Sequence, residues 1–267
     1  MQKQQPHSTF RPSEPSGLSA KKRIMVDDNP REHNVAPSTQ HPLDQQLISR
    51  ASAGDLPWAA KLLELGANPL AQSSQALREA AENGHAECVR LLIPVSDPKA
   101  RGSYALQLAA RNGHVGCVEL LIPASSPQAD DSRALVWAAK KGHAQCVELL
   151  IPVSDPQAER SIAFRGAAQY GHAECVKLLL PYSDPKAMHG QALLLAVENG
   201  HIDCVIVLSE LAPDSIQTPA IPPLARSAEA NGHLDLAAFL RSIHERREIR
   251  SALPAPTKNA PLRATRI

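Results

Sequence analysis

The sequence is poor in aromatic residues, long apolar runs and net charge. Phe, Trp and Tyr make up 3% of the 267 residues, fewer than a large β-sandwich or barrel usually contains, so Ala- and Leu-based helical packing fits better. No apolar run approaches the 18 or more residues of a membrane span, and the N-terminus MQKQQPHSTFRPSEPSG lacks the apolar stretch of a cleaved secretory signal. The net charge of +1 creates no global field for nucleic acid or acidic membranes. We therefore expect no membrane insertion and no specific nucleic-acid binding.

A short internal repeat dominates the rest of the sequence. The dipeptide Gly-His recurs with successive spacings of 29, 29, 29, 29 and 32 residues. Its copies begin at Gly84, Gly113, Gly142, Gly171, Gly200 and Gly232. The five cysteines also lie 29 residues apart, one in each of five repeats. An odd number of cysteines in a chain of this size argues against a disulfide framework and favours a reducing, cytoplasmic compartment.

One repeat, residues 103–131, predicts a pair of short helices. Apolar residues at Leu106, Ala109 and Ala110 have helical spacing, and Ser103 stands where an N-cap belongs. Gly113 suits the left-handed residue that ends a helix. The segment VGCVELLI then forms a second helix, which Pro123 stops.

Such a helix pair cannot bury its apolar seam alone, so the repeats must stack. We count about seven pairs and predict one all-α solenoid over residues 43–248. Residues 1–42 are rich in Gln, Ser and Pro, and we expect disorder there. The last residues, 249–267, are expected to form a basic, disordered tail.

The repeated pattern ALxxAAxxGHxxCVxLLIP resembles the ankyrin repeat, whose units run TPLHxAAxxGHxxVVxLLLxxGA over about 33 residues. The resemblance covers roughly residues 43–245 in six or seven copies in phase. The units here are shorter, because connectors of the type Ser-Asp-Pro stand where that family has a β-hairpin finger. We therefore expect shortened or absent fingers. The histidine of TPLH is also missing, and other residues fill its slot: Arg78, Gln107, Val136, Arg165 and Leu194.

The pattern His-x-x-Cys, present in five repeats, raises the question of metal binding or catalysis. Imidazole and thiolate both bind zinc. The alternative is structural: cysteine fills an apolar slot of the second helix, and the resemblance implies that histidine bridges neighbouring loops. Helices 8–10 Å apart also place successive cysteines too far apart for one tetrahedral site. We favour the structural interpretation and predict no cofactor, no metal site and no enzyme activity.

The resemblance implies that a ligand would lie on the concave face, formed by first helices and connectors. The variable positions of that face combine an apolar and aromatic centre with cations, and carry carboxylates toward both ends. The candidate binding residues are Glu79, Leu108, Arg111, Trp137, Lys140, Lys141, Gln169, Tyr170, Leu195 and Glu198. The alternative for Trp137 is burial in the core, where tryptophan usually lies.

These features predict a monomeric scaffold that binds another protein. The alternative is a bacterial secreted effector, exported into a host cell without a cleaved signal peptide, whose repeats target a host protein. The Ser-, Pro- and Gln-rich N-terminal segment resembles the export signals of such effectors.

Overall fold

A computed structural model describes residues 41–213 and 220–252 of the chain. Most of the two segments expected to be disordered, 1–42 and 249–267, therefore lies outside the described residues. The export hypothesis concerns the first of these segments and stays a prediction. The boundary expected at residue 248 falls inside the last helix, which ends at Ala252.

The described residues form fourteen α-helices in seven consecutive pairs, which confirms the predicted all-α solenoid. The pairs are α1 (Pro42–Ser52) and α2 (Leu56–Glu64), α3 (Ala71–Glu82) and α4 (Ala86–Leu92), α5 (Ala100–Asn112) and α6 (Val115–Leu121), α7 (Ala129–Lys141) and α8 (Ala144–Leu150), α9 (Ala158–Gln169) and α10 (Ala173–Leu179), α11 (Ala187–Glu198) and α12 (Ile202–Leu211), and α13 (Ile221–Ala230) and α14 (Leu234–Ala252). No β-strand occurs within residues 41–213 or 220–252, as expected for repeats that lack fingers. None of the described helices is both long and apolar enough to span a membrane.

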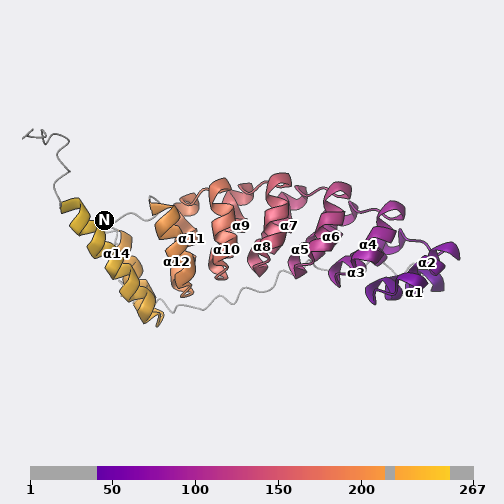
Figure 1. The fold of residues 1–267 in the computed structure, drawn as a ribbon, viewed down its shortest axis with the longest axis horizontal. Helices are drawn as coiled ribbons and strands as arrows, with labels where there is room; N and C mark the ends of the chain where they lie inside the picture. The colour runs from indigo at the N-terminus through magenta and orange to yellow at the C-terminus, as the bar shows by residue number, and fades with distance from the viewer. Residues whose placement is uncertain (1–40, 214–219, 253–267) are drawn as a thin grey trace, which may run out of the picture. The chain divides into compact units, whose positions relative to one another are not determined.

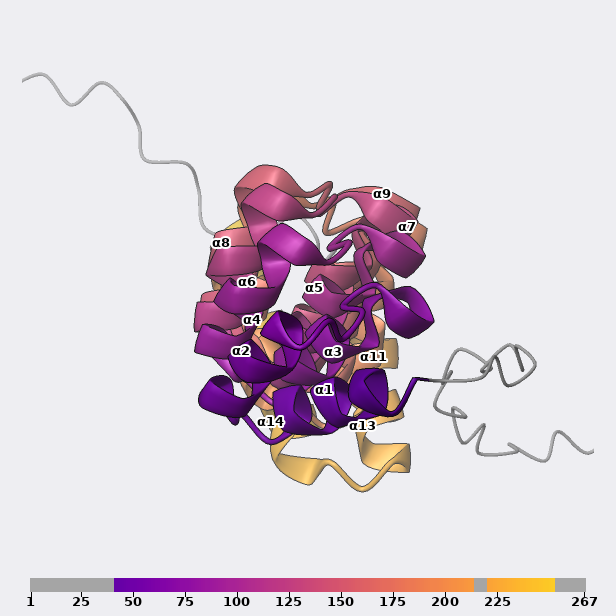
Figure 2. The same cartoon turned by 90° about the vertical axis from the view of Figure 1, so that its right-hand side faces the viewer.

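The pairs follow one another in a row (Figure 1). From α1 to α12 they form two layers, one of odd-numbered and one of even-numbered helices, as the end-on view shows (Figure 2). Each odd-numbered helix from α1 to α11 packs on the next odd-numbered helix, and α2 to α12 pack on one another in the same way. Contacts between residues about 29 positions apart therefore build the fold.

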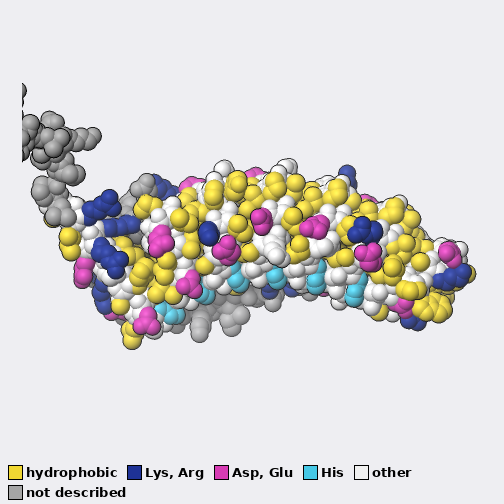
Figure 3. Space-filling model, in the orientation of Figure 1, with side chains coloured by type: hydrophobic (Ala, Val, Ile, Leu, Met, Phe, Trp, Pro, Cys, Tyr) yellow, Lys and Arg dark blue, Asp and Glu magenta, His cyan; other side chains and the backbone are white. Residues whose placement is uncertain are grey.

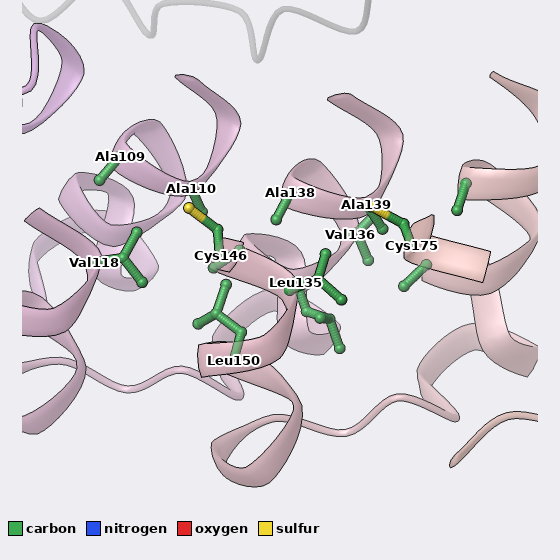
Figure 4. Close-up of a cluster of buried hydrophobic side chains, with 14 of the residues drawn as sticks. Ala109, Ala110, Val118, Leu135, Val136, Ala138, Ala139, Cys146, Leu150 and Cys175 are labelled. Carbon is green, nitrogen blue, oxygen red and sulfur yellow. The ribbon is translucent and has the colours of Figure 1, made fainter. Parts of the chain in front are cut away.

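The core lies between the two layers and consists of small and medium apolar side chains (Figure 4). In the central repeats, Leu135, Ala138 and Ala139 of α7 are fully buried beside Cys146 and Leu150 of α8. All five cysteines are free and buried, so their role as small hydrophobic residues is confirmed. Burial raises the pKa of the Cys146 thiol to about 11, and Cys204 reaches about 12.

The connectors adopt a geometry that the sequence did not predict. Four second helices continue into a short 3₁₀ turn: Ile93–Val95, Ile122–Ala124, Ile151–Val153 and Leu180–Tyr182. Five first helices then open with three residues of left-handed backbone, at residues 72–74, 101–103, 130–132, 159–161 and 188–190. Left-handed conformation costs roughly 1–2 kcal/mol for each residue other than glycine, so contacts elsewhere must stabilise these turns.

Two kinds of side chain bind these left-handed turns. The serines expected at helix N-caps instead accept a hydrogen bond from the following connector, as Ser132 Oγ does from the backbone N–H of Asp155 at 2.8 Å. In three repeats the side chain in the slot of the missing histidine, Arg78, Gln107 or Arg165, donates to carbonyls of the turn, whereas Val136 in the same slot has no donor. Arg165, for example, donates to the carbonyl oxygens of Glu159 and Arg160 at 2.9 and 3.1 Å. Leu194 holds the same slot and has no donor to offer.

The Gly-His turns join each pair to the one before it. Gly142 ends α7 with a φ of 79°, and the Nε2–H of His172 donates to the carbonyl of Lys140 at 3.0 Å. Six histidines make the equivalent bond to the preceding repeat at 2.9–3.2 Å: His85, His114, His143, His172, His201 and His233. Their side chains form a row along one edge of the helices (Figure 3). The bridging role implied by the ankyrin resemblance is confirmed.

Candidate functional site

All the candidate binding residues belong to first helices or their C-terminal caps. We call the side of α3, α5, α7, α9 and α11 that carries these residues the first-helix surface. Leu108 is buried, and the other candidates have some exposed surface. Six are partly buried: Glu79, Arg111, Trp137, Lys140, Gln169 and Leu195. Three are exposed: Lys141, Tyr170 and Glu198. The repeat spacing brings their positions into rows, since equivalent residues occupy neighbouring helices.

Trp137 forms the centre of a cluster with two cations. The guanidinium carbon of Arg111 lies 5.0 Å from the centroid of the indole, and the Lys140 Nζ lies 5.7 Å from it. Cation–π contacts of this length contribute about 0.5–1 kcal/mol each at exposed sites. The indole is only partly buried, unlike Leu135 and Ala138 of the same helix. Trp137 is therefore not a core residue, and its ring is held in place by neighbouring side chains.

Gly166 on α9 shapes one side of this cluster, and the sequence analysis did not select it. It occupies the same repeat position as Trp137, one pair further along the chain. A Cβ built at Gly166 would lie 2.7 Å from Cγ of Lys140, so the stem of that lysine runs across the space that the missing side chain leaves. Glycine inside a helix costs about 0.5–1 kcal/mol relative to alanine. The signal available in the sequence was a glycine at a repeat position that holds Trp137 in the pair before and Leu195 in the pair after.

Leu108 departs from the expectation of an exposed contact residue. Only 5% of its surface is exposed. It lies on α5, which packs against α3 on one side and α7 on the other, and the run from Ala105 to Ala110 is buried throughout. Leu108 is therefore too buried to be an exposed contact residue.

Charge changes along the first-helix surface. Arg111, Lys140 and Lys141 place positive charge at α5 and α7, whereas Glu79 on α3 and Glu198 on α11 carry negative charge toward the two ends. Tyr170, which caps α9, leaves 47% of its surface exposed. Gln169 and Leu195 extend this surface from the centre toward Glu198.

The histidine row fixes the backbone beneath these side chains. Histidines of the following repeats donate hydrogen bonds to the backbone carbonyls of Arg111, Lys140 and Gln169. Burial lowers the pKa of His172. The hydrogen bond to the Lys140 carbonyl raises this pKa, but its effect is smaller than that of burial. The neutral ring is therefore favoured, and it anchors the C-terminal turn of α7 next to the cluster.

The described residues offer little to nucleophilic or metal chemistry. The thiol of Cys175 is buried and burial raises its pKa to about 11, so the thiolate required of a nucleophile or a zinc ligand is scarce at neutral pH. His172, three residues earlier, already donates to a backbone carbonyl. Within residues 41–213 and 220–252, no group of three or more His, Cys, Asp or Glu side chains is placed to hold a metal ion.

Comparison with known proteins agrees with this architecture. The family model for ankyrin repeats in three copies matches residues 47–131, 77–162 and 135–219. Among solved structures, the crystal structure of the human ASB11 ankyrin repeat domain is similar, with 22% sequence identity, a TM-score of 0.56, and coverage of 62% of this chain and 83% of that domain. At this identity the likeness concerns the fold alone. A search of curated proteins gives no significant match. The matches to the ankyrin model together span most of the described helices, and the chain belongs to the ankyrin repeat family.

Proposed function

We propose that this chain is a scaffold whose first-helix surface, around Trp137, binds a partner protein that presents an apolar side chain flanked by carboxylates. Ankyrin repeats are generally protein–protein interaction modules. The observation that carries the proposal is the position of Trp137, partly exposed and in cation–π contact with both Arg111 and Lys140. The fold alone would not justify a site.

The composition of the cluster supports binding. Trp, Tyr and Arg are the residues most often found at energetic hot spots of interfaces. The ring of Trp137 already has cations on it in the free chain, so less side-chain entropy is lost when a partner docks. The α7 backbone is also held by the His172 bond to Lys140.

The charge of the cluster suggests the chemistry of the partner. Arg111, Lys140 and Lys141 would attract carboxylates, which are oriented by charge-assisted hydrogen bonds. The apolar side chain of the partner would lie against the exposed part of the indole, and Tyr170 is the exposed aromatic residue of the next pair. Complementary charge of this kind speeds association and excludes wrong partners.

The proposal is tested by affinity capture from native lysate and from the lysate of a candidate host. The double variant Trp137→Ala/Tyr170→Ala is compared with the wild-type chain. The matched control is Trp58→Ala/Tyr182→Ala, which removes one Trp and one Tyr, each 52% exposed, away from the cluster. Circular dichroism checks that all three proteins keep the same helix content.

The expected result is a partner retained by the wild type and the control and lost by the double variant at the cluster. Removal of two large side chains from a hot spot should weaken binding by more than about a hundredfold. Equal capture by all three proteins would show that the first-helix surface is not the binding site. Loss in both variants would point to misfolding or to a site elsewhere.

A further inference from the structure

An open groove lies between α1 and α3, on the same side of the helices as the Trp137 cluster. Its volume is about 690 Å³, and it is widely open to solvent. Amides, hydroxyls and one carboxylate provide most of its lining, with two apolar side chains among them. The lining residues are Gln45, Ile48, Ser49, Ser52, Ala53, Gln72, Gln75 and Glu79. The Trp137 cluster includes none of them, although Glu79 belongs to the same repeat row.

Glu79 is the charged group of this groove. Its Oε2 accepts a hydrogen bond from Ser52 Oγ at 3.4 Å, and its Oε1 accepts one from Gln75 Nε2 at 3.3 Å. Both donors are neutral and both bonds are long. No ion pair joins Glu79 to a Lys or Arg in the part of the chain that the structure describes. A carboxylate has about four lone-pair sites, so this side chain can accept further bonds from a cation.

The groove and the cluster have a fixed separation along the array. Glu79 on α3 and Trp137 on α7 occupy the same repeat position two pairs apart. Neighbouring helices pack 8–10 Å apart, so the two sites are about 16–20 Å from each other. An extended chain rises about 3.3 Å per residue, and about five to six residue steps therefore cover this distance.

We propose that one extended segment of the partner protein occupies both sites, with a Lys or Arg side chain in the groove at Glu79 and an acidic, apolar element at Trp137. This inference rests on the proposed function, because it assigns the Trp137 cluster to the same partner. The basic residue lies about five to six positions from the apolar one. A segment with a basic end and an acidic end matches the change of charge along the first-helix surface.

The lining of the groove favours an extended backbone. Side-chain amides of Gln45, Gln72 and Gln75 can each donate and accept, as can the hydroxyl of Ser49. An extended peptide exposes unpaired N–H and C=O groups along its length, whereas a helix satisfies those groups internally. The amides of the groove therefore complement a strand-like segment better than a helical one.

The test begins with a phage-displayed library of random 16-residue peptides, selected on the full chain. Enriched peptides should contain carboxylates beside an apolar residue, and a Lys or Arg about five to six positions away. The affinity of one labelled peptide is then measured by fluorescence anisotropy. Glu79→Gln should weaken it about tenfold, the effect of losing one charge-assisted hydrogen bond. Glu119→Gln, the same change on α6 at an exposed position outside the first-helix surface, should leave it unchanged.

A charge exchange separates direct contact from an indirect effect. A peptide in which the basic residue is replaced by Glu should regain affinity on Glu79→Lys, which a structural role of Glu79 could not produce. Peptides that require Trp137 but contain no basic residue, or that ignore Glu79→Gln, would overturn the groove inference and leave the proposed function intact. Failure to enrich any peptide would overturn the inference of an extended segment, whereas peptides that bind Trp137→Ala/Tyr170→Ala as well as the wild type would contradict both proposals.

Discussion

Replacing Gly142 with alanine should cost far more stability than the same change at the equivalent turn of the last pair. Gly142 has a φ of 79°, and a Cβ placed there would lie 2.5 Å from Nδ1 and 2.7 Å from Cε1 of His172. At Gly232, with a φ of 83°, a Cβ meets no atom within 4 Å. The two substitutions therefore share the backbone penalty and differ only in the presence of the neighbouring ring.

The expected magnitudes follow from these contacts. Left-handed backbone costs alanine about 1 kcal/mol, which is the whole effect expected at Gly232. At Gly142 the imidazole must also move by about 1 Å to restore ordinary contact. This movement breaks the 3.0 Å bond to the Lys140 carbonyl, and overpacking of this kind costs typically 1–3 kcal/mol. Gly142→Ala should therefore lower the free energy of unfolding by about 3 kcal/mol.

Urea unfolding followed by circular dichroism measures both changes, and a double-mutant cycle isolates the contact. His172→Ala removes the ring, so Gly142→Ala made in that background should cost only the backbone penalty of about 1 kcal/mol. Gly66→Ala provides a second control near the other end, since its φ is 89° and a Cβ there also meets nothing within 4 Å. Equal losses at Gly142 and Gly232, or strictly additive effects of Gly142→Ala and His172→Ala, would refute the reasoning.

Three further predictions concern the core, the histidine row and the connectors. Cys146→Val should change the free energy of unfolding by less than about 1.5 kcal/mol. In the wild type, the buried thiol should react with iodoacetamide only as fast as the chain opens. Rapid alkylation of the folded protein would contradict the burial of this thiol. Because burial lowers the pKa of His172, the contribution of this ring to stability should be constant above about pH 6.5 and fall as the pH drops toward the lowered value. His172→Gln should flatten that part of the stability profile, and an unaltered profile would show that this ring does not contribute. Leu194→Arg places a donor where Arg165 binds its own turn, and it should stabilise the chain by about 0.5–1 kcal/mol in urea unfolding; no gain would count against the role given to Arg165.

The helix pairs could be predicted because their signals are local and repeat in phase. Gly113 and Pro123 mark the ends of two helices through backbone preferences that operate within a few residues. Cys117 was assigned to the core from its place in the apolar period of the second helix, and it is buried. Repetition strengthens each of these inferences, because a mistaken helix boundary in one repeat would disagree with the equivalent boundaries in the other repeats.

The connectors could not be predicted, because their conformation opposes local preference. Nothing in the sequence Asp130-Asp131-Ser132 favours three consecutive left-handed residues, and single residues other than glycine rarely adopt that region. The turn is held from outside, for example by the bond that Ser132 receives from Asp155. The equivalent serine of the preceding repeat, Ser103, was predicted to be an N-cap, a role that depends on local bonds only.

The repeat, the pairing of helices, and the structural roles of histidine and cysteine could be inferred from the residue pattern and its resemblance to the ankyrin repeat. The tertiary structure decided which side chains of the first-helix surface are accessible. Leu108 and Trp137 hold the same repeat position, yet the first is buried and the second partly exposed. The physical reason is that exposure depends on the side chains that neighbouring repeats contribute. Gly166 accommodates the stem of Lys140, and that contact joins residues 26 positions apart that no local pattern connects.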